Sequence, residues 1–414
     1  MYRVWYSTES LADYFIDHTR LARLGPVVRA RLYESDASNP RNFHAIPDHI
    51  RRILYLDAPD LIVERDNEPV FSVEVTTEAG TGHNAFQRFA RIAAAVENGV
   101  PAFYIYPKAV IVERKKTPPR WDKINPAVFA ALEAVMQIYE IPALLYYFPS
   151  DLAAYPDCTG APHRMTKGLR YDPGFRYAGC PDCADSEMQS LFEAVDELLD
   201  AVERDSVRQA RREALKKLSI RARRGWMQAE YHTKAAGRPL DGMSPLSAVR
   251  MVPTAALLDY LSRYERGGYR IGQLLRGRRM TALYQVNAKF RGDPYPGALA
   301  AIDYLRCREG PTFEDRRHNL ALVFGEAEFD PVRGSLSISG GSGATIEDFF
   351  AAVQSCARHN LLTQPYGALR AEQISRYLMQ VRYGSTYSKV KHIRVYSYFS
   401  DAILFPDGAL WRDG

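Results

Sequence analysis

Residues 58–106 read APDLIVERDNEPVFSVEVTTEAGTGHNAFQRFARIAAAVENGVPAFYIY, and we expect the first domain to form around this stretch. Residues 61–64 form a short, mainly apolar run, whereas residues 70–76 alternate apolar with polar side chains. Both patterns are typical of strands, and the polar residues 64–69 between them predict a turn. The stretch therefore begins with a predicted β-hairpin.

The register of this hairpin decides which acidic side chains meet. If Glu64 lies opposite Val70, then Asp60 lies opposite Glu74. Directly opposed residues in an antiparallel pair have Cβ atoms about 5 Å apart, so the two carboxylates would converge at one end of the sheet. Two such carboxylates suit a hard cation, although a slip of one residue would move one of them to the other face.

A helix and a further strand are expected next. Asn84 can cap a helix that runs to Asn98, and Gly99 can end it. The apolar face of this helix contains Phe86, Phe89, Ala93 and Val96, and its polar face contains Gln87, Arg88 and Arg91. Residues 100–106 have the composition of a buried strand, so that hairpin, helix and strand make a compact α/β unit.

These residues resemble the PD-(D/E)XK nuclease superfamily, which includes many type II restriction endonucleases. The resemblance covers roughly residues 1–150, and its motif is Pro59 and Asp60, a gap of thirteen residues, then Glu74-Val75-Thr76 before a helix that carries Gln87. It implies a restriction-endonuclease-like mixed sheet flanked by helices. It also implies a magnesium site formed by the carboxylates of Asp60 and Glu74 and by the carbonyl of Val75.

Thr76 stands where the family usually has a lysine that orients the attacking water and stabilises charge. The residues that could substitute for it are Glu78, Gln87, Arg88 and Arg91. The predicted catalytic residues are Asp60, Glu74, Thr76 and Gln87. The alternative interpretation is that Asp60 begins a turn and that Glu74 is a solvated strand residue.

Length and composition limit the class of protein. A chain of 414 residues is expected to hold two or three domains, and a formal net charge of +5 permits a nucleic-acid partner without requiring one. The sequence shows no signal-peptide pattern and no apolar run long enough to span a membrane. Five cysteines in so long a chain indicate a reducing, cytoplasmic compartment.

Residues 151–186 are predicted to form a small zinc-knuckle-like insert. The spacing of Cys180 and Cys183 allows two thiolates to bind one zinc ion, and Cys158 and His163 could complete a tetrahedral structural site. Free thiols in a loop are the alternative.

Residues 187–235 are predicted to form a charged connector that is helical to about residue 224. It begins acidic and ends basic, and the basic half, with Arg211 and Arg212, could lie along a phosphate backbone. Helix-dipole pairing on a solvated helix explains the same charges.

Residues 236–414 are predicted to form a mainly helical α+β region that binds nucleic acid, with a winged-helix-like part at 345–411. Basic residues are interleaved with aromatic ones, which suits phosphate contacts and stacking. The predicted contacts are Arg276, Arg278, Arg279, Lys389, Lys391 and Arg394. A helical surface with extended arginines, or a packing domain with tyrosines on its sheet, is the alternative.

The sequence therefore favours a magnesium-dependent endonuclease that hydrolyses double-stranded DNA. With one active site per chain, cutting both strands requires either a homodimer or sequential nicking, and we expect the homodimer. The alternatives are a non-catalytic nucleic-acid-binding protein on a decayed nuclease core and a nuclease directed at single strands or RNA.

Overall fold

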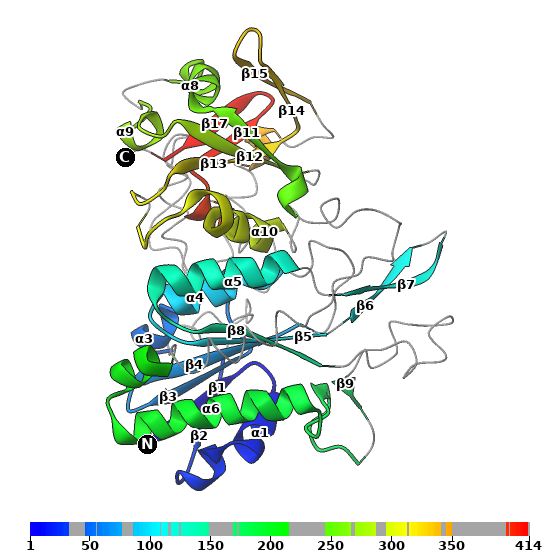
Figure 1. The fold of residues 1–414 in the computed structure, drawn as a ribbon, viewed down its shortest axis with the longest axis vertical. Helices are drawn as coiled ribbons and strands as arrows, with labels where there is room; N and C mark the ends of the chain where they lie inside the picture. Colours follow the sequence, from blue (N-terminus) through cyan, green and yellow to red (C-terminus); the bar gives the residue numbers. More distant parts are fainter. Residues whose placement is uncertain are drawn as a thin grey trace. The chain divides into compact units, whose positions relative to one another are not determined.

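The computed structural model describes residues 1–32, 46–54, 56–76, 86–107, 109–114, 117–123, 126–148, 169–171, 174–214, 245–265, 270–286, 295–312, 314–340, 345–349, 395–396 and 398–412. The chain divides into two compact units (Figure 1). Unit 1 comprises Met1–Tyr33 and Ile46–Ser244, and unit 2 comprises Glu34–Ala45 and Pro245–Gly414.

Unit 1 is built on a six-stranded mixed sheet with the order β2-β1-β3-β4-β5-β8. Its strands are β1 (Tyr2–Tyr6), β2 (Val28–Arg31), β3 (Leu61–Arg65), β4 (Glu68–Val75), β5 (Ala102–Pro107) and β8 (Ala143–Phe148). Strand β3 is antiparallel to both of its neighbours, β1 and β4, whereas β4, β5 and β8 run parallel. The carboxyl ends of β4, β5 and β8 therefore share one edge of the sheet.

Helices cover both faces of this sheet, as Figure 1 shows: α4 and α5 lie on one side and α1 and α6 on the other. Their bounds are α1 (Glu9–His18), α4 (Phe89–Glu97), α5 (Pro126–Tyr139) and α6 (Ser186–Arg204). The smaller elements are η1 (Arg20–Arg23), α3 (Asp48–Arg51), the hairpin β6 (Ala109–Arg114) with β7 (Thr117–Lys123), and the pair β9 (Leu169–Arg170) with β10 (Cys180–Pro181). The expected mixed sheet flanked by helices is confirmed.

The β3–β4 hairpin has the predicted register near the site and a different one near its turn. Leu61 lies opposite Val73, as the predicted register requires, but Glu64 lies opposite Pro69 and not Val70. The turn is a two-residue loop, in which Asp66 and Asn67 have φ values of 52° and 67°. Such a loop fixes the strand pairing beside it, and a bulge after residue 63 then restores the predicted register.

Helix α4 ends where the sequence predicts. Gly99 has φ 74°, its N–H donates to the carbonyl of Val96 at 2.8 Å, and the N–H of Val100 donates to that of Ala95 at 3.0 Å. This is a Schellman ending, which a glycine favours because it adopts positive φ without strain. Regular helix begins at Phe89, later than predicted, and residues 81–85 lie outside the described residues. The four predicted apolar residues are buried.

Helix α6 belongs to unit 1. Asp185 caps it by accepting from the N–H groups of Glu187 and Met188 at 3.0 and 3.3 Å. Its apolar face is buried against the sheet, so the first part of the predicted connector is a packing helix. The continuous helix predicted to about residue 224 is wrong, because α6 ends at Arg204 and Asp205 is extended; a separate helical stretch occupies residues 207–214.

Unit 2 is built on a five-stranded mixed sheet with the order β11-β12-β13-β16-β17. The central strands β12, β13 and β16 are parallel, and the two edge strands are antiparallel to their neighbours. Its strands are β11 (Val249–Pro253), β12 (Met280–Val286), β13 (His318–Phe324), β16 (Ala402–Phe405) and β17 (Gly408–Trp411), with a separate hairpin of β14 (Glu326–Asp330) and β15 (Ser335–Ser339). Its helices are η6 (Pro245–Ala248), α8 (Thr254–Ser262), α9 (Gln273–Arg276), α10 (Tyr295–Ile302) and the π-helical turn η7 (Asp303–Cys307).

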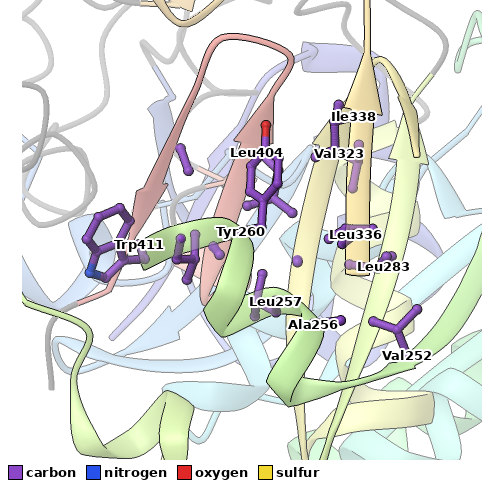
Figure 2. Packing of buried hydrophobic residues seen from close by; sticks show 14 of the residues in the cluster. Val252, Ala256, Leu257, Tyr260, Leu283, Val323, Leu336, Ile338, Leu404 and Trp411 are labelled. Atoms are coloured by element: carbon purple, nitrogen blue, oxygen red, sulfur yellow. The ribbon is translucent and has the colours of Figure 1, made fainter. Parts of the chain in front are cut away.

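The apolar core of unit 2 lies between α8 and the sheet. Figure 2 shows Leu257 and Tyr260 of α8 against strand residues such as Leu283, Val323 and Leu404. The described part of this unit is thus organised around a sheet, and the expectation of a mainly helical region is wrong for it. The winged-helix-like part expected at 345–411 contains a hairpin of β16 and β17, but β16 pairs in parallel with β13, so this hairpin is the edge of an α/β sheet and not a wing.

Candidate active site

Asp60 and Glu74 meet at the carboxyl end of β4. The backbone N–H of Asp60 donates to the carbonyl of Val73 at 3.0 Å, which extends the hairpin by one residue. The N–H of Val75 donates to Asp60 Oδ2 at 2.9 Å, so the Asp60 side chain reaches the strand that carries Glu74. Ser7 Oγ lies 3.2 Å from Asp60 Oδ1 and donates to it. The structure therefore brings together the two acids that the register predicts.

The two carboxylates differ in their exposure to water. Glu74 is 2% exposed, whereas the Asp60 side chain is 24% exposed. The interpretation of Glu74 as a solvated strand residue is therefore wrong. Both faces of β4 are covered, because α4 lies over the face that bears Glu74 and Phe71, on the opposite face, packs near Phe15 of α1.

Arg91 of α4 connects three carboxylates. Its Nη1 donates to both oxygens of Glu74 at 2.9 Å and lies 3.9 Å from Asp60 Oδ1. Its Nε donates to Asp57 Oδ2 at 2.6 Å, and the Arg88 Nε is 3.3 Å from Glu74 Oε1. Arg91 is only 5% exposed, so this residue of the predicted polar face lies in the interior, beside the site. Its burial is possible because the acids of the neighbouring strands neutralise it.

Burial raises the pKa of Glu74 well above its ordinary range. The Arg91 and Arg88 guanidiniums act in the opposite direction without cancelling this effect, and the charge of Asp60 adds to it. Glu74 is thus a buried carboxylate for which two guanidiniums do not fully compensate the loss of hydration. More positive charge at this position would stabilise its ionised form.

Thr76 does not replace the missing lysine. It is 2% exposed, its N–H donates to the carbonyl of Ile105 at 2.9 Å, and its hydroxyl lies 2.9 Å from the Tyr104 hydroxyl in a hydrogen bond. Thr76 is therefore a packed residue of the sheet. Gln87 is half-buried in the turn before α4, and Glu78 lies outside the described residues.

Asp57 is a site residue that sequence reasoning missed. It is 6% exposed and precedes Asp60 by three residues in the loop before β3. Strand periodicity gives no information about a loop side chain. The one sequence feature that could have indicated Asp57 is the presence of two aspartates in LDAPD, residues 56–60.

The donor set fits a hard divalent cation. Asp60, Glu74 and the backbone around Val75 offer oxygen ligands, and a guanidinium already lies against both carboxylates. Over the described ranges, no group of three or more His, Cys, Asp or Glu side chains is placed to hold a metal ion. A magnesium ion here would thus rest on two carboxylates, backbone and water, as this ion often does.

The predicted zinc ligands are only partly described. Cys158 and His163 lie outside the described residues. Cys180 and Cys183 are free thiols, and burial raises the pKa of Cys180 to about 12, which favours its protonated form. Zinc binding at these residues stays a prediction.

The predicted nucleic-acid contacts separate into three groups. Arg212, Arg276 and Arg279 are exposed and Arg211 is half-buried, whereas Lys389, Lys391 and Arg394 lie outside the described residues. The assignment of Arg278 to a binding surface is wrong, because it is 7% exposed and its Nη1 contacts Asp401 at 3.1 Å and Asn319 at 2.9 Å. Arg278 is therefore an internal ion-pair partner of Asp401, a buried residue more than a hundred positions later in the chain.

Comparisons with protein-family models, with curated proteins and with solved structures found no match. None of the described helices is long and apolar enough to cross a membrane.

Proposed function

We propose that this chain is a metal-dependent endonuclease that hydrolyses phosphodiester bonds in DNA. The observation that carries the proposal is the meeting of Asp60 and Glu74 at the carboxyl end of β4, beside the parallel strand β5. Ligand sites in sheets with parallel strands lie at this edge. A buried carboxylate with a raised pKa next to a second acid is also typical of functional sites.

Asp60, Glu74 and the Val75 carbonyl are the groups that would hold the magnesium ion. Such an ion, when bound, supplies a hydroxide nucleophile and stabilises charge on the phosphate. Arg91 is the residue best placed to act for the missing lysine, because its guanidinium lies against both carboxylates. Guanidinium geometry suits a phosphate, which it can contact through two N–H groups.

A second candidate is a nucleic-acid-binding protein on a decayed nuclease core. Two observations favour it: both oxygens of Glu74 already accept from Arg91, and Thr76 offers no cation. Under this hypothesis the exposed arginines carry the function, and binding weakens with salt while magnesium causes no cleavage.

The test is cleavage of supercoiled plasmid with magnesium or EDTA by the wild-type chain and Glu74→Gln. The matched control is Glu64→Gln, since Glu64 is also 2% exposed, is ion-paired with Arg3 and contacts His49. Magnesium-dependent cleavage that is lost in Glu74→Gln and kept in Glu64→Gln supports the proposal. If the chain binds nucleic acid but cuts neither duplex DNA, single-stranded DNA nor RNA, the second candidate is favoured. Cleavage of RNA or single strands alone would keep the nuclease activity but replace duplex DNA as its substrate.

A further inference from the structure

Arg91 fills the position on Glu74 where a divalent cation would bind. Its Nη1 is 2.9 Å from each carboxylate oxygen of Glu74, and so lies midway between them. A cation held by both oxygens of one carboxylate takes the same position. The same nitrogen is 3.9 Å from Asp60, the other proposed ligand. One guanidinium therefore contacts both carboxylates from the place that the metal requires.

Asp57 holds this guanidinium through a different atom. Arg91 Nε donates to Asp57 Oδ2 at 2.6 Å, and the other oxygen of Asp57 accepts from the backbone N–H of Ala58 at 2.9 Å. The Asp57 carboxylate is thus fixed by its own backbone. Because Nε and Nη1 are separate donors, the contact with Asp57 does not depend on the contact with Glu74.

We propose that Arg91 is a displaceable internal cation that competes with the divalent metal for Glu74, and that Asp57 is the positioning residue that retains it when metal binds. The inference rests on the proposed function, since it concerns the same two carboxylates. A buried guanidinium that left Glu74 without another partner would carry a large desolvation cost. Asp57 supplies that partner and keeps the arginine beside the site, where a bound phosphate would meet it.

The experiment measures manganese affinity by titration calorimetry on the full-length chain. In Arg91→Lys the charge is kept, but one ammonium nitrogen cannot contact Asp57 and both oxygens of Glu74 together. Loss of the charge-assisted contact with Glu74 is expected to tighten manganese binding roughly 10- to 100-fold. Asp57→Asn is expected to act in the opposite direction and weaken it about tenfold, because Arg91 then depends more on Glu74.

Arg3→Lys is the matched control. Arg3 Nη1 contacts Glu64, the other buried glutamate of the hairpin, at 2.7 Å, and its replacement is expected to leave manganese affinity unchanged. Thermal unfolding with and without manganese gives a second readout, because a tighter ligand raises the midpoint further.

The outcomes separate this inference from the proposed function. Glu74-dependent manganese binding that is equal or weaker in Arg91→Lys overturns the competition and leaves the metal site in place. If neither the wild-type chain nor any variant binds manganese more tightly than Glu74→Gln does, both the metal site and the competition are refuted. Should Arg91→Lys not fold, Asp57→Asn decides, since unchanged or tighter binding in that variant contradicts the role of Asp57.

Discussion

Asp401→Asn is expected to cost unit 2 about 3–5 kcal/mol of its free energy of unfolding, the usual result of removing one partner of a buried ion pair. Asp401 is 2% exposed. Its Oδ2 accepts from Arg316 Nη1 at 2.7 Å and from the N–H of Leu320 at 2.9 Å, while its Oδ1 lies 3.1 Å from Arg278 Nη1. Asparagine keeps the shape and leaves two buried guanidiniums without this charge.

The pH dependence of this loss has a defined sign. Burial alone would raise the pKa of Asp401, but Arg316, Arg278 and the Leu320 N–H together lower it below its ordinary value. The stabilisation is therefore fully present above the unfolded pKa, which is about 3.9, and is lost as pH falls through the still lower folded pKa. Wild type and Asp401→Asn should converge only in that acidic range.

Denaturant unfolding at pH 7 and at decreasing pH, followed by the fluorescence of the buried Trp411, measures both effects. Asp259→Asn is the control, because its ion pair with Arg263 at 2.8 Å joins side chains that are 57% and 50% exposed. Exposed pairs contribute only about 0–1 kcal/mol. An Asp401→Asn loss as small as that of the control would refute the reasoning that the burial of this pair makes its removal costly.

Two further predictions concern the zinc and nucleic-acid hypotheses. Elemental analysis is expected to find zinc in the purified chain and none in the double variant Cys180→Ser with Cys183→Ser. The control Cys307→Ser, whose thiol is buried in unit 2, should keep its zinc. Equal zinc content in all variants would exclude the zinc knuckle. Arg276→Ala, at an exposed position, is expected to lower the salt dependence of DNA binding by about one phosphate contact, whereas Arg278→Ala should lower stability and leave that slope unchanged.

The sequence was informative where a simple periodicity governed the structure. Alternation along residues 70–76 predicted strand β4, and Gly99 marked the end of α4 because positive φ is needed there. The pairing assumed for Glu64 and Val70 was wrong, but the bulge after residue 63 restores the register that the prediction of Asp60 near Glu74 required. It was misleading where a distant partner decided the outcome. Arg278 was predicted to lie on a binding surface, yet Asp401, more than a hundred residues later in the chain, holds it in the interior. Arg91 was a candidate for the site, but nothing in the sequence indicated its contact with Asp57.

The buried charges of the two units point to different roles. In unit 1 the carboxylates of Asp57, Asp60 and Glu74 meet the guanidiniums of Arg91 and Arg88 at the carboxyl edge of the parallel strands. In unit 2, Asp303 and Asp401 meet Arg278, Arg308 and Arg316. There Arg278 and Arg316 lie two residues before β12 and β13, and Asp401 directly precedes β16, so the cluster lies at the amino ends of the parallel strands.

This difference has a chemical consequence. Among these described side chains acids outnumber bases in unit 1 and bases outnumber acids in unit 2, so added positive charge would be favourable only in the first cluster. Sheets with parallel strands bind ligands at the carboxyl edge, whereas the opposite edge serves stability. A divalent cation is therefore expected to bind and stabilise unit 1 through Asp60 and Glu74, while the cluster of unit 2 holds its strands together without one.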